Sequence, residues 1–148
     1  MALLLVDLDN FKLVNDTYGH AVGDKLLNII AMRLKSCAGE SDAVARVGGD
    51  EFAVILEEVS ASHPVERVAD AIVSLTSEPC IIDGQQITCG TSVGGALHRP
   101  GDGCTRNELF LKADTALYAA KHAGKGRFIV FSASETASRD PGSRPTSI

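Results

Sequence analysis

The chain has 148 residues, of which 45% are hydrophobic and 22% charged, with 14 glycines and 5 prolines, a composition typical of one globular domain and unlike that of a collagen-like or disordered chain. Fourteen basic against nineteen acidic residues give a net charge of -5, which disfavours nucleic acid as a partner, so a nucleotide ligand would need a metal ion or a local basic cluster. No apolar stretch reaches the roughly 18 to 20 residues of a membrane helix, and the start lacks the basic flank and cleavage site of a secretory signal.

The first forty residues predict one strand followed by two helices. Residues 2–6 are continuously apolar, which is typical of a central strand buried on both faces. A short helix is expected over residues 10–18, ending at Gly19, and an amphipathic helix over residues 20–37. The apolar stripe of the longer helix consists of Val22, Leu26, Ile30, Leu34 and Cys37.

A hairpin and a third helix are expected next. Residues 43–47 and 52–56 are short β-branched segments on either side of Gly48-Gly49-Asp50-Glu51, so two acids would lie at the hairpin tip. Pro64 suits the first turn of a helix that runs to about Ser77. The buried stripe of that helix is expected to be Val65, Val68, Ile72 and Leu75.

The remaining elements are a second hairpin, a helix and a last strand. The hairpin pairs residues 80–82 with 86–97 around Asp83-Gly84. After a loop over residues 99–105, Thr105 and Glu108 form the capping box of a helix that Gly124 and Gly126 end. Its inward residues are expected to be Leu109, Ala113, Leu117 and Ala120, the last strand spans residues 127–131, and the Ser, Thr and Pro-rich tail over 132–148 is expected to be disordered.

The order of these elements predicts the fold class. Strand, helix, helix, hairpin, helix, hairpin, helix and strand together suit an α/β (α+β) sandwich of the ferredoxin-like kind. In such a fold, helices cover a largely antiparallel central sheet. A chain of this length can bury a modest but adequate core.

The four cysteines predict reduced thiols. They contain no CxxC pair and have no histidine at zinc-finger spacing. In the second hairpin, Cys80 would lie opposite Ile87 and Cys89 opposite Glu78, so these two thiols would not face each other. Reduced thiols and the lack of export signals favour a cytoplasmic protein.

Four acids are candidates for a metal site. Asp7 and Asp9 follow the first strand, and Asp50 and Glu51 lie at the hairpin tip, which a ferredoxin-like sheet can place beside that strand end. Clustered carboxylates raise each other's pKa unless a cation neutralises them, and hard oxygen ligands favour Mg²⁺ or Mn²⁺. The simpler alternative is surface acids that flank a turn. A calcium-binding EF-hand loop is excluded, because its sixth and twelfth positions are Lys12 and Tyr18.

Two further features each allow a simple and a functional interpretation. Gly48 and Gly49 suit a tight turn, but they also let a base or phosphate approach the backbone where a Cβ would clash. Lys121 and Lys125 lie around the end of a helix, where basic side chains complement the helix dipole. Neither feature identifies a ligand by itself.

Three ordered blocks resemble the GGDEF domain of bacterial diguanylate cyclases. Residues 6–20, VDLDNFKLVNDTYGH, are similar to its D-x-D-x-F-K-x-x-N-D-x-x-G-H block and are followed by Gly23-Asp24. Residues 46–52, RVGGDEF, contain the signature, and residues 114–121, DTALYAAK, resemble its D-x-A-L-Y-x-A-K block. The resemblance implies a palm-type nucleotidyl cyclase domain over residues 1–131.

The resemblance implies a metal site with two Mg²⁺ (or Mn²⁺) ions. Asp7 and Asp50, with the carbonyl of Leu8, would hold them, and Glu51 would complete the acidic site. Asp50 and Glu51 would be the catalytic residues, with Glu51 helping to remove the proton of the 3′-hydroxyl group.

The resemblance also implies a GTP site. Asn15 and Asp24 would bond to the guanine edge, since a carboxylate accepts from the guanine N1 and N2 hydrogens. Gly48 and Gly49 would let the nucleotide lie against the hairpin. The phosphates would be bound by Lys121, Lys125 and the backbone around Phe11 and Lys12 at a helix start.

The implied reaction joins two GTP molecules into cyclic di-GMP and releases two pyrophosphates. Because one domain holds one GTP, two copies must meet as a C2 homodimer. The chain departs from the family pattern in two respects: it lacks the helix and D-x-L-T-G-L-x-N-R segment before the first strand, and it carries neither a coiled coil nor the upstream sensory domain that could be its partner. Two alternatives remain open: an inactive GGDEF module that binds GTP or a protein, and a related cyclase or polymerase for another nucleotide, which Asn15 and Asp24 disfavour.

A feedback site is expected to be missing. Many members of the family bind cyclic di-GMP with an R-x-x-D motif whose Asp lies six positions before the first Gly of the signature. Here Asp42 fills the acidic position, but the Arg position is Gly39, followed by Glu40. Neither residue can make the bidentate phosphate contacts of a guanidinium, so no product inhibition is expected through this site.

Overall fold

The computed structural model describes residues 1–132, so the tail expected to be disordered lies, apart from Ser132, outside the described residues. The strands are β1 (Ala2–Leu8), β2 (Ala43–Arg46), β3 (Glu51–Leu56), β4 (Cys80–Ile82), β5 (Gln85–Ile87), β6 (Thr91–Leu97) and β7 (Phe128–Val130). The helices are α1 (Phe11–Tyr18), α2 (His20–Cys37), α3 (Val65–Thr76) and α4 (Arg106–His122). None of these helices is long and apolar enough to cross a membrane.

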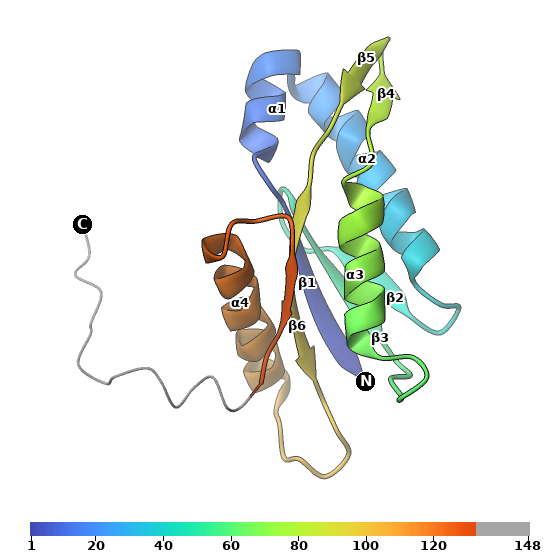
Figure 1. The fold of residues 1–148 in the computed structure, drawn as a ribbon, viewed down its shortest axis with the longest axis vertical. Coiled ribbons are helices and arrows are strands. Elements are labelled where there is room, and N and C mark those ends of the chain that lie inside the picture. The colour runs from blue at the N-terminus through green and yellow to red at the C-terminus, as the bar shows by residue number, and fades with distance from the viewer. Residues whose placement is uncertain (133–148) are drawn as a thin grey trace, which may run out of the picture.

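A five-stranded sheet in the order β2-β3-β1-β6-β7 forms the centre of the molecule (Figure 1). β1 pairs antiparallel with β3 on one side and β6 on the other, and only β7 joins in parallel. The strands β6, β1, β3 and β2 therefore have the antiparallel order expected of a ferredoxin-like sheet. The mixed α/β fold class predicted from the order of elements is confirmed.

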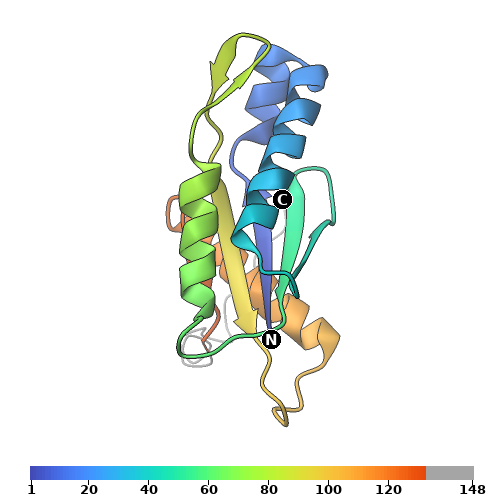
Figure 2. The ribbon, with the colours of Figure 1, turned by 90° about the vertical axis from the view of Figure 1, so that its right-hand side faces the viewer.

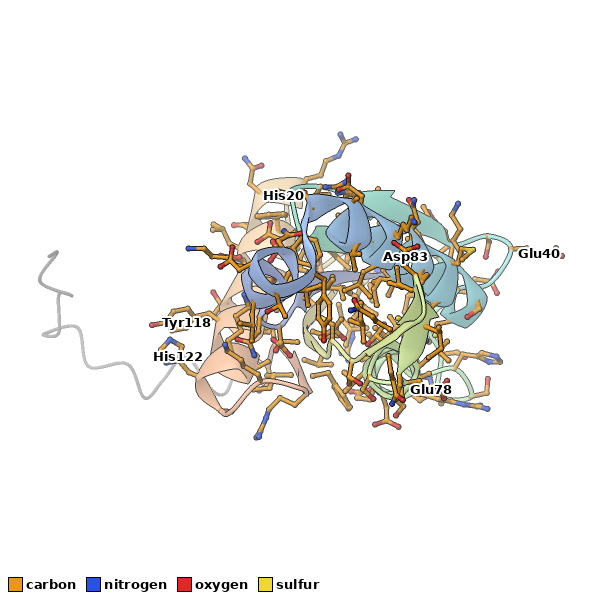
Figure 3. All side chains as sticks on the ribbon, turned by 90° about the horizontal axis from the view of Figure 1, so that it is seen from above. His20, Glu40, Glu78, Asp83, Tyr118 and His122 are labelled. Carbon is orange, nitrogen blue, oxygen red and sulfur yellow. The ribbon has the colours of Figure 1, made fainter. Side chains whose placement is uncertain are left out.

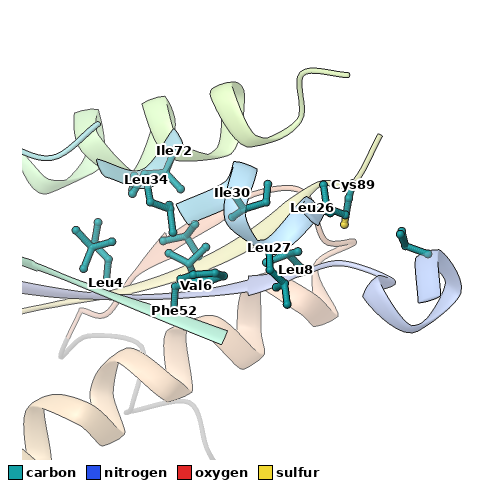
Figure 4. Close-up of a cluster of buried hydrophobic side chains, with 14 of the residues drawn as sticks. Leu4, Val6, Leu8, Leu26, Leu27, Ile30, Leu34, Phe52, Ile72 and Cys89 are labelled. Atoms are coloured by element: carbon teal, nitrogen blue, oxygen red, sulfur yellow. The ribbon is translucent and has the colours of Figure 1, made fainter. Parts of the chain in front are cut away.

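Helices cover both faces of the sheet, with α2 and α3 on one side and α4 on the other (Figures 1 and 2). Because successive side chains of a strand point to opposite faces, β1 contributes to two cores. Leu4, Val6 and Leu8 pack in the cluster under α2 and α3 (Figure 4), whereas Leu5 packs with Ala113 and Leu117 of α4. The predicted burial of this strand on both faces is confirmed.

A glycine in β6 lets α4 lie close to the sheet. A Cβ at Gly94 would be 2.1 Å from the backbone nitrogen of Leu117 and 2.2 Å from the carbonyl oxygen of Ala113, both in α4. Real Cβ atoms do not approach backbone so closely, so any other residue here would push the helix away. The helix begins at the predicted capping box, in which Glu108 and Thr105 exchange side-chain to backbone hydrogen bonds.

The second hairpin was predicted with too long a second strand, over residues 86–97. β4 and β5 form a separate two-stranded sheet around Asp83-Gly84, and β6 instead pairs with β1. The chain leaves the hairpin at Cys89, whose thiol donates to the carbonyl of Asp9, while the Asp9 N–H donates to Gly90 at 2.8 Å. These contacts draw the chain to the end of β1, where β6 joins the central sheet between β1 and β7.

Two smaller expectations also change. The first strand continues to Leu8, so Asp7 lies within the strand rather than after it. In α3 the buried residues include Ala69 and Thr76, while Val68 and Leu75 are only half-buried. The Thr76 hydroxyl is satisfied by a hydrogen bond to Thr91 at 2.7 Å, which explains how a polar residue lies in this core. Cys37 and Leu109 are likewise half-buried.

The cysteine prediction holds among the residues that the structure describes. All four thiols are free, and Cys80 lies opposite Ile87 as expected. Cys89 follows the end of β5 rather than pairing with Glu78. Burial raises the pKa of the Cys89 thiol to about 12, so this thiol is protonated and behaves as part of the core.

Candidate active site

Asp7 is a buried carboxylate near the end of β1. The alternation of the strand turns its side chain to the α4 face, opposite Glu51 of β3 and Ser92 of β6. It is only 5% exposed, and its Oδ1 atom has no hydrogen-bond partner among residues 1–132. Burial raises the pKa of Asp7 above its ordinary value; the adjacent Lys121 opposes the shift, and the charges of Asp50 and Glu51 add to it.

Lys121 lies in the last turn of α4 and donates from its Nζ atom to Oδ2 of Asp7. Lys125 follows the helix in a left-handed conformation, with φ of 62°, and its Nζ donates to Oδ1 of Asn10 at 3.1 Å. Both predicted phosphate-binding lysines therefore lie beside the turn between β1 and α1. The contact of either lysine with phosphate remains a prediction.

Asp9 has a different role from Asp7, although only two positions separate them. Its Oδ1 accepts from the hydroxyl of Ser92 at 2.7 Å, and its Oδ2 accepts from the N–H of Gly126 at 3.0 Å. Asp9 thus connects the start of α1 to β6 and to the turn after α4. The sequence groups Asp9 with the candidate metal-binding acids; in the structure both of its carboxylate oxygens accept hydrogen bonds from other chain segments.

The exposed side chain of Arg46 binds the backbone of the hairpin tip. Its Nε donates to the carbonyls of Gly48 and Gly49 at 3.1 and 3.0 Å, and its terminal nitrogen donates to Gly49 at 2.7 Å. The Leu8 N–H donates to the Asp50 carbonyl at 3.1 Å, which places Asp50 at the end of β1. The tip acids and the strand end meet as expected, and the positioning role of Arg46 was missed from the sequence.

The two glycines of the signature are not required by the turn itself. Neither Gly48 nor Gly49 has a positive φ. A Cβ at Gly49 would meet nothing within 4 Å, and one at Gly48 would make only ordinary contact with Glu51, at 3.4 Å. The fold would therefore tolerate alanine at both positions, so the reason for glycine lies outside the packing of this domain.

An open pocket of about 460 Å³ lies between α1, α2 and the hairpin tip. It is lined by six of the predicted site residues: Phe11, Lys12, Asn15, Asp24, Gly49 and Asp50. Sequence analysis assigned no role to the other four lining residues, which are Asp16, His20, Leu27 and Arg46. His20 is exposed at the beginning of α2 (Figure 3).

Gly23 positions Asn15 in this pocket. A Cβ on Gly23 would lie 1.8 Å from Oδ1 of Asn15 and 3.2 Å from Cζ of Phe11. Gly23 therefore lets α1 approach α2 and leaves room for the Asn15 amide. Sequence analysis missed this role, although a glycine inside a helix costs about 1 kcal/mol against alanine and so signals a packing reason.

The predicted metal-binding acids share one end of the sheet but do not form a tight cluster. Among residues 1–132, the group of three ligand-type side chains whose atoms lie within 4.8 Å of one another is His98, Asp102 and Cys104, not Asp7, Asp50 and Glu51. Their ligand atoms are nevertheless oxygens, which suit a hard divalent cation, and Oδ1 of Asp7 is buried with no hydrogen-bond partner among residues 1–132.

The position of the expected feedback site is occupied by a structural carboxylate. Oδ2 of Asp42 accepts from the N–H of Gly39 at 2.7 Å, and Oδ1 accepts from the N–H of Glu57 at 3.0 Å. Asp42 therefore fastens the turn after α2 to the end of β3.

Comparison with known proteins identifies the family. The family profile described as "Diguanylate cyclase, GGDEF domain" matches residues 1–127. The chain is 41% identical over 127 residues to diguanylate cyclase TpbB of Pseudomonas aeruginosa, covering 85% of this chain and 29% of that protein. It is 40% identical over 131 residues to the cyclic di-GMP phosphodiesterase PdeR of Escherichia coli, covering 88% of this chain and 20% of that protein.

A solved structure agrees with this match. The crystal structure of the GGDEF domain of TpbB from Pseudomonas aeruginosa superposes with a TM-score of 0.82 and 39% identity, covering 88% of this chain and 81% of that one. The chain therefore belongs to the GGDEF family of diguanylate cyclase domains, whose members are generally metal-dependent. It spans 20% to 29% of the length of the two full-length relatives named above.

Proposed function

We propose that this domain is a diguanylate cyclase that condenses two GTP molecules into cyclic di-GMP with release of two pyrophosphates. The observation that carries the proposal is the pocket that joins Asn15 and Asp24 to Gly49 and Asp50. A guanine reader and a hairpin-tip acid in one cavity suit a reaction on a guanine nucleotide. Family membership and 41% identity to a protein named as a diguanylate cyclase support the same reaction.

The guanine base would bind between α1 and α2. Asp24 is exposed at the pocket wall and would accept from the guanine N1 and N2 hydrogens, while the Asn15 amide would bond to the neighbouring edge. Gly48 and Gly49 are free of internal packing demands, so their missing Cβ atoms would serve the approach of the nucleotide to the hairpin.

The acids at the end of β1 suit two Mg²⁺ or Mn²⁺ ions. Asp7, the Leu8 carbonyl, Asp50 and Glu51 would hold them, and Oδ1 of Asp7 is buried with no hydrogen-bond partner among the described residues. When bound, the metal would lower the pKa of the 3′-hydroxyl group and stabilise negative charge on the α-phosphate. Glu51 would help to remove the proton of that hydroxyl group.

The phosphates would extend from the metal site towards α1 and α4. Lys121 would exchange its bond with Asp7 for a phosphate oxygen, and Lys125 would do the same from its contact with Asn10. The backbone around Phe11 and Lys12, at the start of α1, would donate to the terminal phosphate. These contacts would keep the departing pyrophosphate charge-balanced.

Two copies of the domain must cooperate. In each half-reaction a 3′-oxygen of one GTP bonds to the α-phosphorus of the other, and the bond from that phosphorus to the bridging oxygen of pyrophosphate breaks. A C2 homodimer would place the two nucleotides face to face. Other domains of the whole protein, such as a sensory domain, would then control activity through dimer geometry. GTP supply and reduced thiols both suit the cytoplasm.

The test is product formation by the purified chain. Incubation with Mg²⁺ and GTP, followed by chromatography of the nucleotides, should give cyclic di-GMP. Asp50→Ala and Glu51→Ala should abolish the product while the circular dichroism spectrum is kept, because tip acids contribute little core area. Glu58→Ala, an exposed acid beyond β3, serves as the control and should leave turnover unchanged. Normal turnover by a folded Asp50→Ala variant would rule the proposal out.

A second candidate is a GGDEF module that binds GTP or a protein partner without turnover. The observation that favours it is the 40% identity to PdeR, a relative that is named as a phosphodiesterase and not as a cyclase. GTP binding measured by calorimetry, with no cyclic di-GMP in the same sample, would support it over the cyclase.

A further inference from the structure

A separate group of ligand-type side chains lies in the loop between β6 and α4. β6 runs antiparallel to β1, with Leu97 opposite Ala2 and Thr91 opposite Leu8. The loop after Leu97 is therefore at the far end of the sheet from Asp7, where Figure 1 shows it below the other elements. Nothing in this loop takes part in the proposed cyclase site.

Three different metal-ligating atoms converge in this loop. One ring nitrogen of His98, one carboxylate oxygen of Asp102 and Sγ of Cys104 all lie within 4.8 Å of one another. Nδ1 of His98 and Oδ1 of Asp102 are 3.2 Å apart. Two ligands of a tetrahedral zinc ion, each at about 2.0 to 2.1 Å, would be separated by about 3.3 Å. The separation of the nitrogen and oxygen atoms thus fits a shared ion, and Sγ of Cys104 lies close enough to become the third ligand if it moves towards them.

The loop is held in shape by its own backbone contacts. Oδ2 of Asp102 accepts from the N–H of Arg99, and Oδ1 accepts from the N–H of Cys104, both at 2.8 Å. Gly101 and Gly103, with φ of 82° and 68°, supply the left-handed turns that the loop needs. A rigid loop would lose little conformational entropy when an ion binds.

We propose that His98, Asp102 and Cys104 form a zinc-binding site. Imidazole, carboxylate and thiolate are the three ligand types of Zn²⁺, whereas the soft sulfur atom disfavours Mg²⁺ and Ca²⁺. Three protein ligands leave a fourth position for water. The His98 and Asp102 side chains are 34% and 30% exposed, so an ion can reach them from solvent.

Cys104 also lies against the start of α4. Nζ of Lys112, in the second turn of α4, lies 3.6 Å from Sγ of Cys104. Thr105, which caps α4, follows directly. A zinc ion here would connect the end of β6 to the start of the helix that carries Lys121, and it would stabilise the folded domain by mass action.

The test uses Co²⁺ as a spectroscopic substitute for Zn²⁺, on the full chain without an affinity tag, under reducing conditions and in excess Mg²⁺. A thiolate-to-cobalt charge-transfer band should appear in the wild type and disappear when Zn²⁺ is added. Cys104→Ser should lose the band, and His98→Gln should weaken Zn²⁺ binding by about tenfold or more in calorimetry. Cys37→Ser, which removes another half-buried thiol, should keep the band.

Melting temperatures provide a second measurement, which also serves if a variant folds too poorly for the cobalt titration. In the same excess of Mg²⁺, added Zn²⁺ should further raise the melting temperature of the wild type and of Cys37→Ser, but not that of His98→Gln. The absence of a cobalt band in the wild type, or a band that persists in Cys104→Ser, would overturn the proposal. In that case Asp102 would serve only to shape the loop through its backbone contacts.

Discussion

Lys121 of α4 is the ion-pair partner of Asp7, whose side chain is buried in the central strand β1. The pair joins residues 114 positions apart and leaves Oδ1 of Asp7 with no partner among residues 1–132. One lysine therefore balances the carboxylate that the family pattern assigns to metal, and the same lysine is expected to bind phosphate. Lys121 cannot fill both roles at once, because its ammonium group cannot pair fully with Asp7 and with a phosphate oxygen at the same time.

Removing Lys121 should destabilise the domain when no metal is present. Lys121→Ala would leave the buried Asp7 carboxylate without its counter-charge, and we expect a loss of about 1 to 3 kcal/mol in the free energy of unfolding. The side chain of Lys121 is 36% exposed, so solvent screening places the loss near the lower end. Urea denaturation in EDTA measures it. Lys125→Ala, whose partner is the neutral Asn10, is the control and should change stability by less than about 0.5 kcal/mol. Equal losses would contradict the role given to Asp7.

Neutralising Asp7 should have the opposite effect on stability. Burial raises the pKa of Asp7 above its ordinary value of 3.8, so the folded state disfavours the charged form at neutral pH. Asp7→Asn should therefore raise the melting temperature in EDTA. The gain should be full above the raised pKa and vanish below 3.8, where both folded and unfolded chains protonate the carboxyl group.

The same variant should lose its response to metal. Mg²⁺ should raise the melting temperature of the wild type, because bound metal neutralises Asp7, and should leave that of Asp7→Asn almost unchanged. Asp70→Asn, an exposed acid on α3, provides the control for general charge effects. If Asp7→Asn melts below the wild type at pH 7 in EDTA, the ion pair with Lys121 outweighs the cost of burial.

A methyl group at Gly23 should damage the nucleotide pocket. Alanine usually stabilises a helix interior by about 1 kcal/mol, but its Cβ here would overlap Oδ1 of Asn15. We expect Gly23→Ala to lower the melting temperature and to weaken GTP binding by about tenfold or more. Gly49→Ala, at a position with open space, should leave the melting temperature unchanged. A stabilised Gly23→Ala variant with normal GTP affinity would contradict the prediction, because it would show that α1 can shift to make room for the methyl group.

Asp24 should determine the choice of base. Asp24→Ala removes the acceptor for the guanine N1 and N2 hydrogens, so GTP affinity should fall by about tenfold or more while ATP affinity changes little. Asp16→Ala is the matched control, because it removes another exposed carboxylate from the same pocket. Calorimetric titration with both nucleotides gives the ratio. Equal losses for GTP and ATP in Asp24→Ala would argue against base recognition by this residue.

The wild type should show no product inhibition through Asp42. Its carboxylate is bonded to the N–H groups of Gly39 and Glu57, and no guanidinium occupies position 39. Gly39→Arg should create cyclic di-GMP binding. Gly39→Lys should create much less, because lysine adds the same charge but cannot make the paired hydrogen bonds of a guanidinium to phosphate. Calorimetry and a GTP turnover assay with added product measure both. Tight product binding by the wild type that Asp42→Ala abolishes would contradict the prediction.

Local patterns predicted most of the secondary structure because they depend on neighbouring residues. The bounds of α2 follow from one apolar stripe, and the start of α4 follows from Thr105 and Glu108. The prediction of one long second strand in the second hairpin was wrong, because residues 91–97 pair instead with β1, about ninety positions away. No local pattern records that competition between two possible partner strands.

The sequence by itself determined the family, the order of elements and the residue types available to the site, because motifs and periodicity are local properties. Only the tertiary structure decided which polar side chains remain available. Asp7 and Asp9 look equivalent in the motif, yet Asp9 bonds to Ser92 and Gly126, 83 and 117 positions away, while Asp7 keeps an unpartnered oxygen among the described residues. A carboxylate bonds to whichever donors the fold brings within about 3 Å, and those donors come from strands and turns far away in the chain.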